Sequence, residues 1–228
     1  MKLAAPIAAL AAIAACGMPA VAQDGGASAQ PTAMEVLARC RDMLPRAPIA
    51  LSGSIIVRNR KGISSAEYDY SLEMDRTAVP AKLDVEVRER GTTNVVGRAT
   101  MRRPGPVQEG TIFKTDVKWT DLALDFLWWP EAEYDGAREG ESVHGQTCTV
   151  IVAKNGAERM RLWTDRKTGC LMQAEELDLS GIARRRIWGT RLKKFDERWM
   201  ASVLEVETLG GGRRTKITVE ELKEKQQN

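Results

Sequence analysis

Histidine is almost absent from this chain, and its scarcity excludes several kinds of catalytic site. His144 is the only histidine among 228 residues, and no cluster of cysteines or carboxylates accompanies it at the spacing of metal ligands. Transition-metal sites need such clusters, so we expect no metal site and no metal cofactor. A Ser-His-Asp triad would have to use His144, but no Gly-x-Ser-x-Gly turn supplies the serine. We therefore predict that the protein is not an enzyme.

The sequence also lacks a phosphate-binding loop and a strong excess of one charge. The glycine run at residues 210–212 lies between two predicted strands rather than before a helix. The net charge of +3 is too small to predict a nucleic-acid partner. The arginine triplet at residues 184–186 could meet anionic headgroups. A strand whose arginines pair across to neighbouring strands is the favoured interpretation.

Only one long apolar run occurs, at residues 3–15. It is too short to span a bilayer, it follows Lys2, and Ala20-Val21-Ala22 after it is a pattern that a signal peptidase reads. We predict a signal peptide over residues 1–22, export to the periplasm and no transmembrane helix in the mature protein. An alternative is a lipid anchor on Cys16, because Ile13-Ala14-Ala15-Cys16 matches the pattern before a lipidated cysteine.

Cysteine is scarce, and its number is odd once the signal peptide is removed. Cys40, Cys148 and Cys170 remain, and three thiols cannot all pair within one chain. The predicted strands place Cys148 and Cys170 on opposite sides of a shared neighbour, about 9.5 Å apart. A disulfide does not tolerate that separation, so we predict buried free thiols.

The rest of the sequence predicts a single β-rich domain over residues 31–222, between a flexible linker at 23–30 and a disordered tail at 223–228. Thr32 and Glu35 have the form of a capping box, and they open an amphipathic helix that ends before Pro45. From residue 49, apolar and polar residues alternate between turn signals, which is typical of an antiparallel sheet. The expected strands are 49–58, 64–75, 82–89, 93–102, 107–118, 143–153, 158–165, 169–177, 184–193, 198–208 and 213–221.

One helix is predicted among the strands, at residues 120–129. Thr120 can cap it, Pro130 ends it, and Asp121 and Asp125 share one face. On the other faces, Leu124 pairs with Trp128, and Leu122 groups with Phe126 and Trp129. One sheet cannot cover so many apolar faces, so we expect the helix to line or plug an apolar cavity. Core packing is the alternative for each tryptophan taken alone.

Residues 119–130, WTDLALDFLWWP, resemble a motif of bacterial outer membrane lipoprotein-sorting proteins with a LolA-like domain. Residues 161–165, 167–169, 192–195 and 214–219 extend the likeness to about residues 48–222. The resemblance implies a mainly β fold, an incomplete antiparallel β-barrel of about eleven strands with short helices over an apolar cavity. In such carriers the cavity holds the acyl chains of lipoproteins, and an arginine controls the lid. No residue of this chain matches that arginine.

The prediction is a non-enzymatic periplasmic carrier, without cofactor, that binds lipids or lipoproteins and sorts lipoproteins to the outer membrane. Its expected partners are acyl chains and membrane-associated donor or acceptor proteins, and no nucleic acid. The alternative is an envelope-stress sensor or protein-interaction module with the same fold and no transfer activity. The residues expected to bind lipid come from two segments: Leu83, Val85, Val87, Leu122, Leu124, Phe126, Leu127, Trp128 and Trp129.

Overall fold

The computed structural model describes residues 30–225, apart from 104, 106–107 and 196–197. The expected signal peptide and nearly all of the expected linker lie outside the described residues. Helix α1, Ala33–Asp42, has the predicted capping box: the Glu35 N–H donates to the Thr32 hydroxyl at 3.2 Å, and the Thr32 N–H donates to the Glu35 carboxylate at 2.7 Å. Within the described ranges, no helix combines the length and the apolar character needed to cross a membrane.

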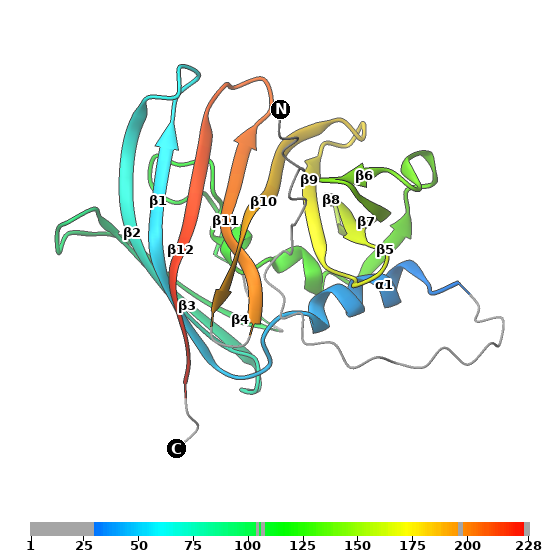
Figure 1. The fold of residues 1–228 in the computed structure, drawn as a ribbon, viewed down its shortest axis with the longest axis horizontal. Helices are drawn as coiled ribbons and strands as arrows, with labels where there is room; N and C mark the ends of the chain where they lie inside the picture. Colours follow the sequence, from blue (N-terminus) through cyan, green and yellow to red (C-terminus); the bar gives the residue numbers. More distant parts are fainter. Residues whose placement is uncertain (1–29, 104, 106–107, 196–197, 226–228) are drawn as a thin grey trace, which may run out of the picture.

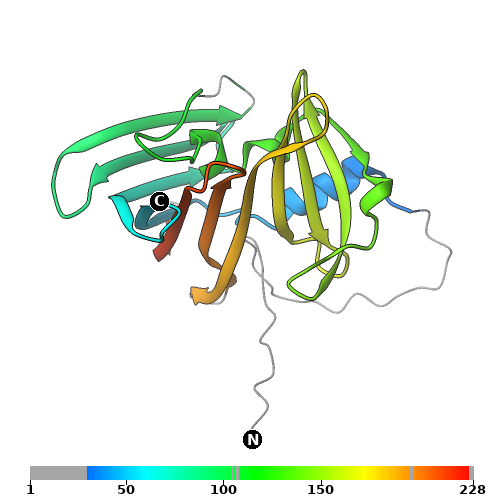
Figure 2. The same cartoon turned by 90° about the horizontal axis from the view of Figure 1, so that it is seen from above.

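The strands form one antiparallel sheet that does not close into a barrel (Figures 1 and 2). Eleven of them follow the order β4-β3-β2-β1-β12-β11-β10-β9-β8-β7-β5, and β6 pairs beside β7. The incomplete barrel predicted from the sequence is confirmed. The bounds are β1 Ile49–Arg58, β2 Ser64–Asp75, β3 Ala81–Glu89, β4 Val95–Arg103, β5 Glu131–Tyr134, β6 Ser142–Val143, β7 Gln146–Asn155, β8 Glu158–Asp165, β9 Leu171–Leu177, β10 Ala183–Phe195, β11 Arg198–Thr208 and β12 Arg214–Glu224.

The alternation in the sequence corresponds to the two faces of the sheet. Tyr70 pairs with Val87 and Leu72 with Val85, and all four side chains are buried on the inner face. The polar residues between them lie on the outer face, because successive side chains of a strand point to opposite sides. This inner face and α1 enclose one large hydrophobic cluster.

The strand prediction differs from the structure in several places. Residues 108–118 form a compact turn instead of a strand, because Gly110 and Lys114 adopt left-handed backbone conformations with φ of 88° and 55°. The Ile112 N–H donates to the Val117 carbonyl at 2.8 Å, so the chain folds back on itself there. Strand β5 was missed, since four residues are too few to show an alternation. Strand β12 runs to Glu224, two residues into the expected tail.

The cysteines agree with the prediction. Cys40, Cys148 and Cys170 are buried, and none of the three is in a disulfide. Cys148 pairs with Asp165, and the Asp165 N–H donates to the Cys170 carbonyl at 2.8 Å. Asp165 therefore separates the two cysteines, as the strand pattern indicated.

Candidate functional site

Residues 119–129, called the plug segment below, lie against the inner face of the curved sheet. The segment has two short parts, the α-helical turn α2 at Trp119–Leu122 and the 3-10 turn η1 at Asp125–Trp128. The continuous helix predicted for 120–129 is wrong, because Leu124 between them has a left-handed backbone with φ of 49°. Lys118 is the N-cap residue of α2 in place of Thr120.

The break in the helix follows from two buried carboxylates that contact different strands. Asp121 forms an ion pair with Arg185 of β10, and Asp125 forms one with Arg103 of β4. β4 is one end of the sheet and β10 lies far from it in the strand order. Side chains four residues apart on a continuous helix point the same way, so an unbroken helix could not reach both arginines.

Asp121 belongs to a network of charged side chains that attaches α2 to β9 and β10. Arg185 also donates to Glu176 at 2.7 Å, and the Lys118 ammonium donates to the same carboxylate at 2.9 Å. Burial raises the pKa of Asp121, although Arg185 and the Lys118 N–H act against it. Burial acts to raise the pKa of Glu176 as well, but its bonds to Lys118 and Arg185 outweigh that effect and the pKa lies below its usual value.

Asp125 attaches η1 to the other end of the sheet, through Arg103 of β4. The indole N–H of Trp129 donates to the Asp125 carboxylate at 3.3 Å. The Arg76 guanidinium lies 6.0 Å from the centre of the Trp128 ring. η1 therefore spans from β4 to the end of β2, with Trp128 partly exposed at that edge.

All nine residues expected to bind lipid lie in one hydrophobic cluster, and their role in binding stays a prediction. The expected pairing of Leu124 with Trp128 is wrong, since the helix is broken, whereas Phe126 and Trp129 line one pocket together. Trp128 lies beside Met101 and Leu83, whereas Leu124 lies beside Leu171 of β9. Six of the nine are buried and three are partly buried: Leu83, Val85, Val87, Leu124, Phe126 and Leu127, then Leu122, Trp128 and Trp129.

The expected apolar cavity is largely filled by the plug segment. An apolar pocket of about 30 Å³ lies at Trp128, bounded by Met74, Leu83, Met101 and Ala123. A second pocket of about 200 Å³ lies at Trp129, and both are smaller than the ~300–1,000 Å³ of typical ligand sites. An acyl ligand would have to displace part of the segment. The second pocket joins apolar side chains to the Asp121 network, and its lining includes Lys118, Asp121, Phe126, Trp129, Arg159, Met160, Glu176 and Leu177.

The sequence does not predict the ion pairs of Asp121 and Asp125, because each charged residue taken alone is typical of a solvent-exposed position. Asp121 and Asp125 look like the wet face of a helix, and residues 184–186 look like a solvated strand. The cross-strand pairing expected for these arginines is confirmed: Arg186 contacts Glu175 of β9 at 2.9 Å, as Arg185 contacts Glu176. No local pattern distinguishes the buried Arg185 from the more exposed Arg184 and Arg186.

Solved structures share this fold. A LolA superfamily protein from Nitrosomonas europaea has a TM-score of 0.60 at 13% identity and covers 87% of this chain and 96% of that chain. A DUF1329 family protein from Desulfovibrio piger has a TM-score of 0.58 at 16% identity, with 84% and 91% covered. An outer membrane lipoprotein-sorting protein domain from Vibrio parahaemolyticus has a TM-score of 0.55 at 14% identity, with 86% and 92% covered. The LolA-like fold predicted from the sequence is confirmed.

Sequence comparison gives the family. No curated protein matches this chain. A family model described as "-like: Uncharacterized protein" matches residues 98–227, more than half of the chain. The chain therefore belongs to this family of uncharacterized proteins, and its fold is LolA-like.

Proposed function

We propose that the protein is a non-enzymatic periplasmic carrier that binds acyl chains between the plug segment and the inner face of the sheet. The observation that carries this proposal is the plug segment itself, which fills the apolar space of an open sheet while Leu122, Trp128 and Trp129 stay partly exposed. An acyl chain can replace the contacts that these side chains make. Each methylene that leaves water contributes about 0.8 kcal/mol, so one long chain is a substantial ligand.

The plug segment has the construction of a movable element. α2 and η1 have four residues each, and helices this short have little stability of their own. Their position depends on the ion pairs of Asp121 and Asp125 and on apolar contacts. If the segment moves outward, the side chains of Leu83, Val85 and Met101 on β3 and β4 become available to a ligand.

The proposal includes the location and the biological role. Residues 1–22 are the proposed signal peptide, and residues 31–222 are the proposed carrier domain. The proposed role is the transfer of lipoproteins, or of another acylated lipid, between membrane-associated partners. The fold shared with an outer membrane lipoprotein-sorting protein domain supports this role.

Tryptophan fluorescence tests the binding site. Titration with palmitate should shift the emission of the wild-type protein, and Trp128→Ala or Trp129→Ala should abolish most of that shift. Trp188→Ala is the matched control, because Trp188 lies on the outer face of β10 beneath the Arg214 guanidinium. It should keep the ligand-dependent part of the shift. No shift in the wild-type protein would contradict the proposal.

Stability separates a ligand contact from a core residue. At least one of the two plug variants should lose palmitate affinity while keeping most of its free energy of unfolding. Truncation of a fully packed aromatic residue costs about 3–5 kcal/mol instead. If both variants unfold the domain and the wild type does not respond to palmitate, the plug segment is only part of the core.

A further inference from the structure

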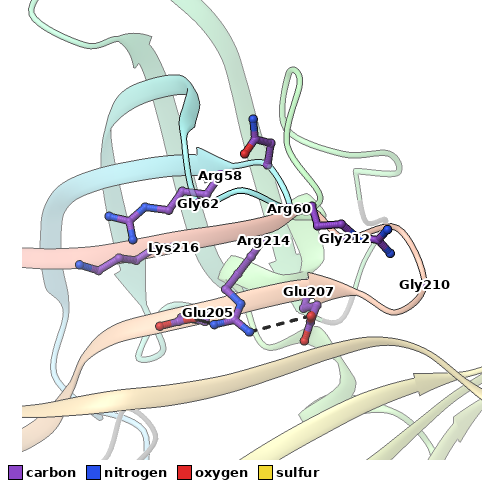
Figure 3. A pocket seen from close by; sticks show the side chains of 10 residues that line it. Arg58, Arg60, Gly62, Glu205, Glu207, Gly210, Gly212, Arg214 and Lys216 are labelled. Carbon is purple, nitrogen blue, oxygen red and sulfur yellow. Dashed lines mark hydrogen bonds and ion pairs between the residues drawn. The ribbon is translucent and has the colours of Figure 1, made fainter.

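A further pocket lies away from the plug segment, on the outer face of the sheet (Figure 3). Its volume is about 490 Å³, and it lies where β1, β11 and β12 reach their hairpins. Arg58 pairs with Arg214, and their inward neighbours Val57 and Thr215 are buried. Because side chains alternate along a strand, those that line this pocket, called the groove below, point away from the hydrophobic cluster. A ligand in the groove therefore does not make the contacts that the plug segment offers.

The groove carries an excess of positive charge. Four cationic side chains and two carboxylates line it, so it has two unbalanced positive charges. Glu205 approaches Arg214 at 3.1 Å and Glu207 approaches it at 3.9 Å. Within the ranges that the structure describes, Arg58, Arg60 and Lys216 have no carboxylate partner. These three cations are therefore available to an anionic ligand.

One of these cations lies close to the β11–β12 hairpin. Gly212 has a left-handed backbone with φ of 67°, and a Cβ built on it would lie 2.7 Å from the Nε atom of Arg60. The absence of a side chain at residue 212 thus leaves room for the Arg60 side chain against the β11–β12 hairpin. The hairpin is itself fixed by Arg213, which donates to Asp116 at 2.9 Å.

Exposed apolar side chains lie on the same edge of the sheet. The end of β1 pairs with the start of β12, and the end of β9 pairs with the start of β10. Thr208, the last residue of β11, pairs with Arg185 near the start of β10. The loops at 59–63, 178–182 and 209–213 therefore share one edge, called the hairpin rim below (Figure 1). Three side chains at this rim are exposed: Ile63 by 60%, Leu179 by 72% and Ile182 by 58%.

We propose that the hairpin rim is a membrane-docking surface for anionic phospholipids. The phosphodiester headgroups bind Arg58, Arg60 and Lys216 in the groove, and Ile63, Leu179 and Ile182 insert between headgroups. Cations beside exposed apolar side chains are the combination that binds a lipid–water interface, since each provides attraction that the other lacks. This docking does not depend on the proposed carriage of acyl chains.

Vesicle sedimentation tests the docking surface. The purified protein should bind vesicles of phosphatidylglycerol and phosphatidylcholine, bind pure phosphatidylcholine vesicles much more weakly, and lose affinity as salt rises. The triple variant R58Q/R60Q/K216Q should bind the anionic vesicles about a hundredfold more weakly, at roughly fivefold for each cation. The variant I63S/L179S/I182S should also bind more weakly. Far-ultraviolet circular dichroism should show that both variants fold, because they change mainly exposed residues.

The matched control removes three cations from the opposite edge, in R46Q/K223Q/K225Q. This variant has the same net charge as the groove variant and should keep wild-type affinity. Equal losses of affinity in the groove variant R58Q/R60Q/K216Q and in the control variant R46Q/K223Q/K225Q would overturn the proposal. Equal binding of the wild-type protein to neutral and anionic vesicles would also overturn it. Binding of soluble glycerol phosphate without binding to anionic vesicles would also overturn it, because the groove would then serve a free phosphate compound.

Discussion

Leu127 and Trp128 are adjacent in the chain but differ in their surroundings. Leu127 is 1% exposed, whereas Trp128 is only partly buried beside the Arg76 guanidinium. Leu127→Ala should lower the free energy of unfolding by about 2–5 kcal/mol, because it leaves a cavity in a packed cluster. Trp128→Ala should cost less. Urea denaturation of both variants measures the difference, and a Leu127→Ala variant as stable as the wild type would contradict the packing described here.

A second prediction about a single residue follows from the burial of the Cys40 thiol. Burial raises its pKa from 9.0 to about 12, and the neighbouring Cys170 adds to the effect. Since the thiolate is the reactive form, Cys40 should not react with iodoacetamide at pH 8 until the protein unfolds. Peptide mass spectrometry after labelling, with and without guanidinium chloride, measures this. Rapid labelling of Cys40 in the folded protein would contradict its burial.

The raised pKa of the Cys40 thiol also determines how the free energy of unfolding changes with pH. The folded protein favours the neutral thiol more strongly than the unfolded chain does. The contribution of Cys40 to folding is therefore complete below about pH 9 and is lost as the pH rises towards 12. Comparison with Cys40→Ala in alkaline denaturation isolates this contribution.

At the scale of elements, the sequence predicts the strands better than the plug segment. Strands such as β3 follow from alternation, because burial on one face imposes a period of two. The plug segment escapes such reasoning, since its shape is set by Arg103 and Arg185, which come from distant strands. A continuous helix satisfies the local pattern of residues 120–129, and only the positions of these arginines exclude it.

The Asp121–Arg185 pair gives the prediction at this scale. Arg185→Met leaves the Asp121 carboxylate buried without its guanidinium partner, so it should lower the free energy of unfolding by about 3–5 kcal/mol. The double variant Asp121→Leu with Arg185→Met should recover much of that loss. Thermal denaturation of the single and double variants measures the coupling.

A surface pair is the control for this cycle. Arg138 contacts Glu141 at 3.0 Å, and both side chains are about two-fifths exposed. Arg138→Gln should change the free energy of unfolding by at most about 1 kcal/mol. Equal effects of Arg138→Gln and Arg185→Met would mean that the buried network does not fix the plug segment.

At the scale of the whole molecule, the fold class follows from regular alternation and frequent turns. The turn at 108–118 could not be predicted, because Ile112 and Val117 also suit a strand and the left-handed conformation of Lys114 has no signal in the sequence. The sequence predicts that residues 120–129 line or plug an apolar cavity, but it does not decide between these two arrangements. Alternation shows which strand residues point inward, but it does not show whether a ligand or the plug segment covers them.

The N-terminal prediction concerns residues outside the described part of the chain. Intact-mass measurement of the protein from an envelope fraction should give a chain that starts at Gln23, because Ala20-Val21-Ala22 is the expected cleavage site. A chain that starts at Cys16 and carries a diacylglycerol would show instead that the protein is lipid-anchored.

Native mass spectrometry of the purified protein tests the carrier proposal most directly. The proposal predicts a bound species with the mass of an acylated lipid, one per chain, released by Trp128→Ala or Trp129→Ala and retained by Trp188→Ala. A protein partner captured without lipid would favour an interaction module instead. A protein that carries no lipid when isolated, and takes up none after incubation with acylated lipids, would contradict the proposal.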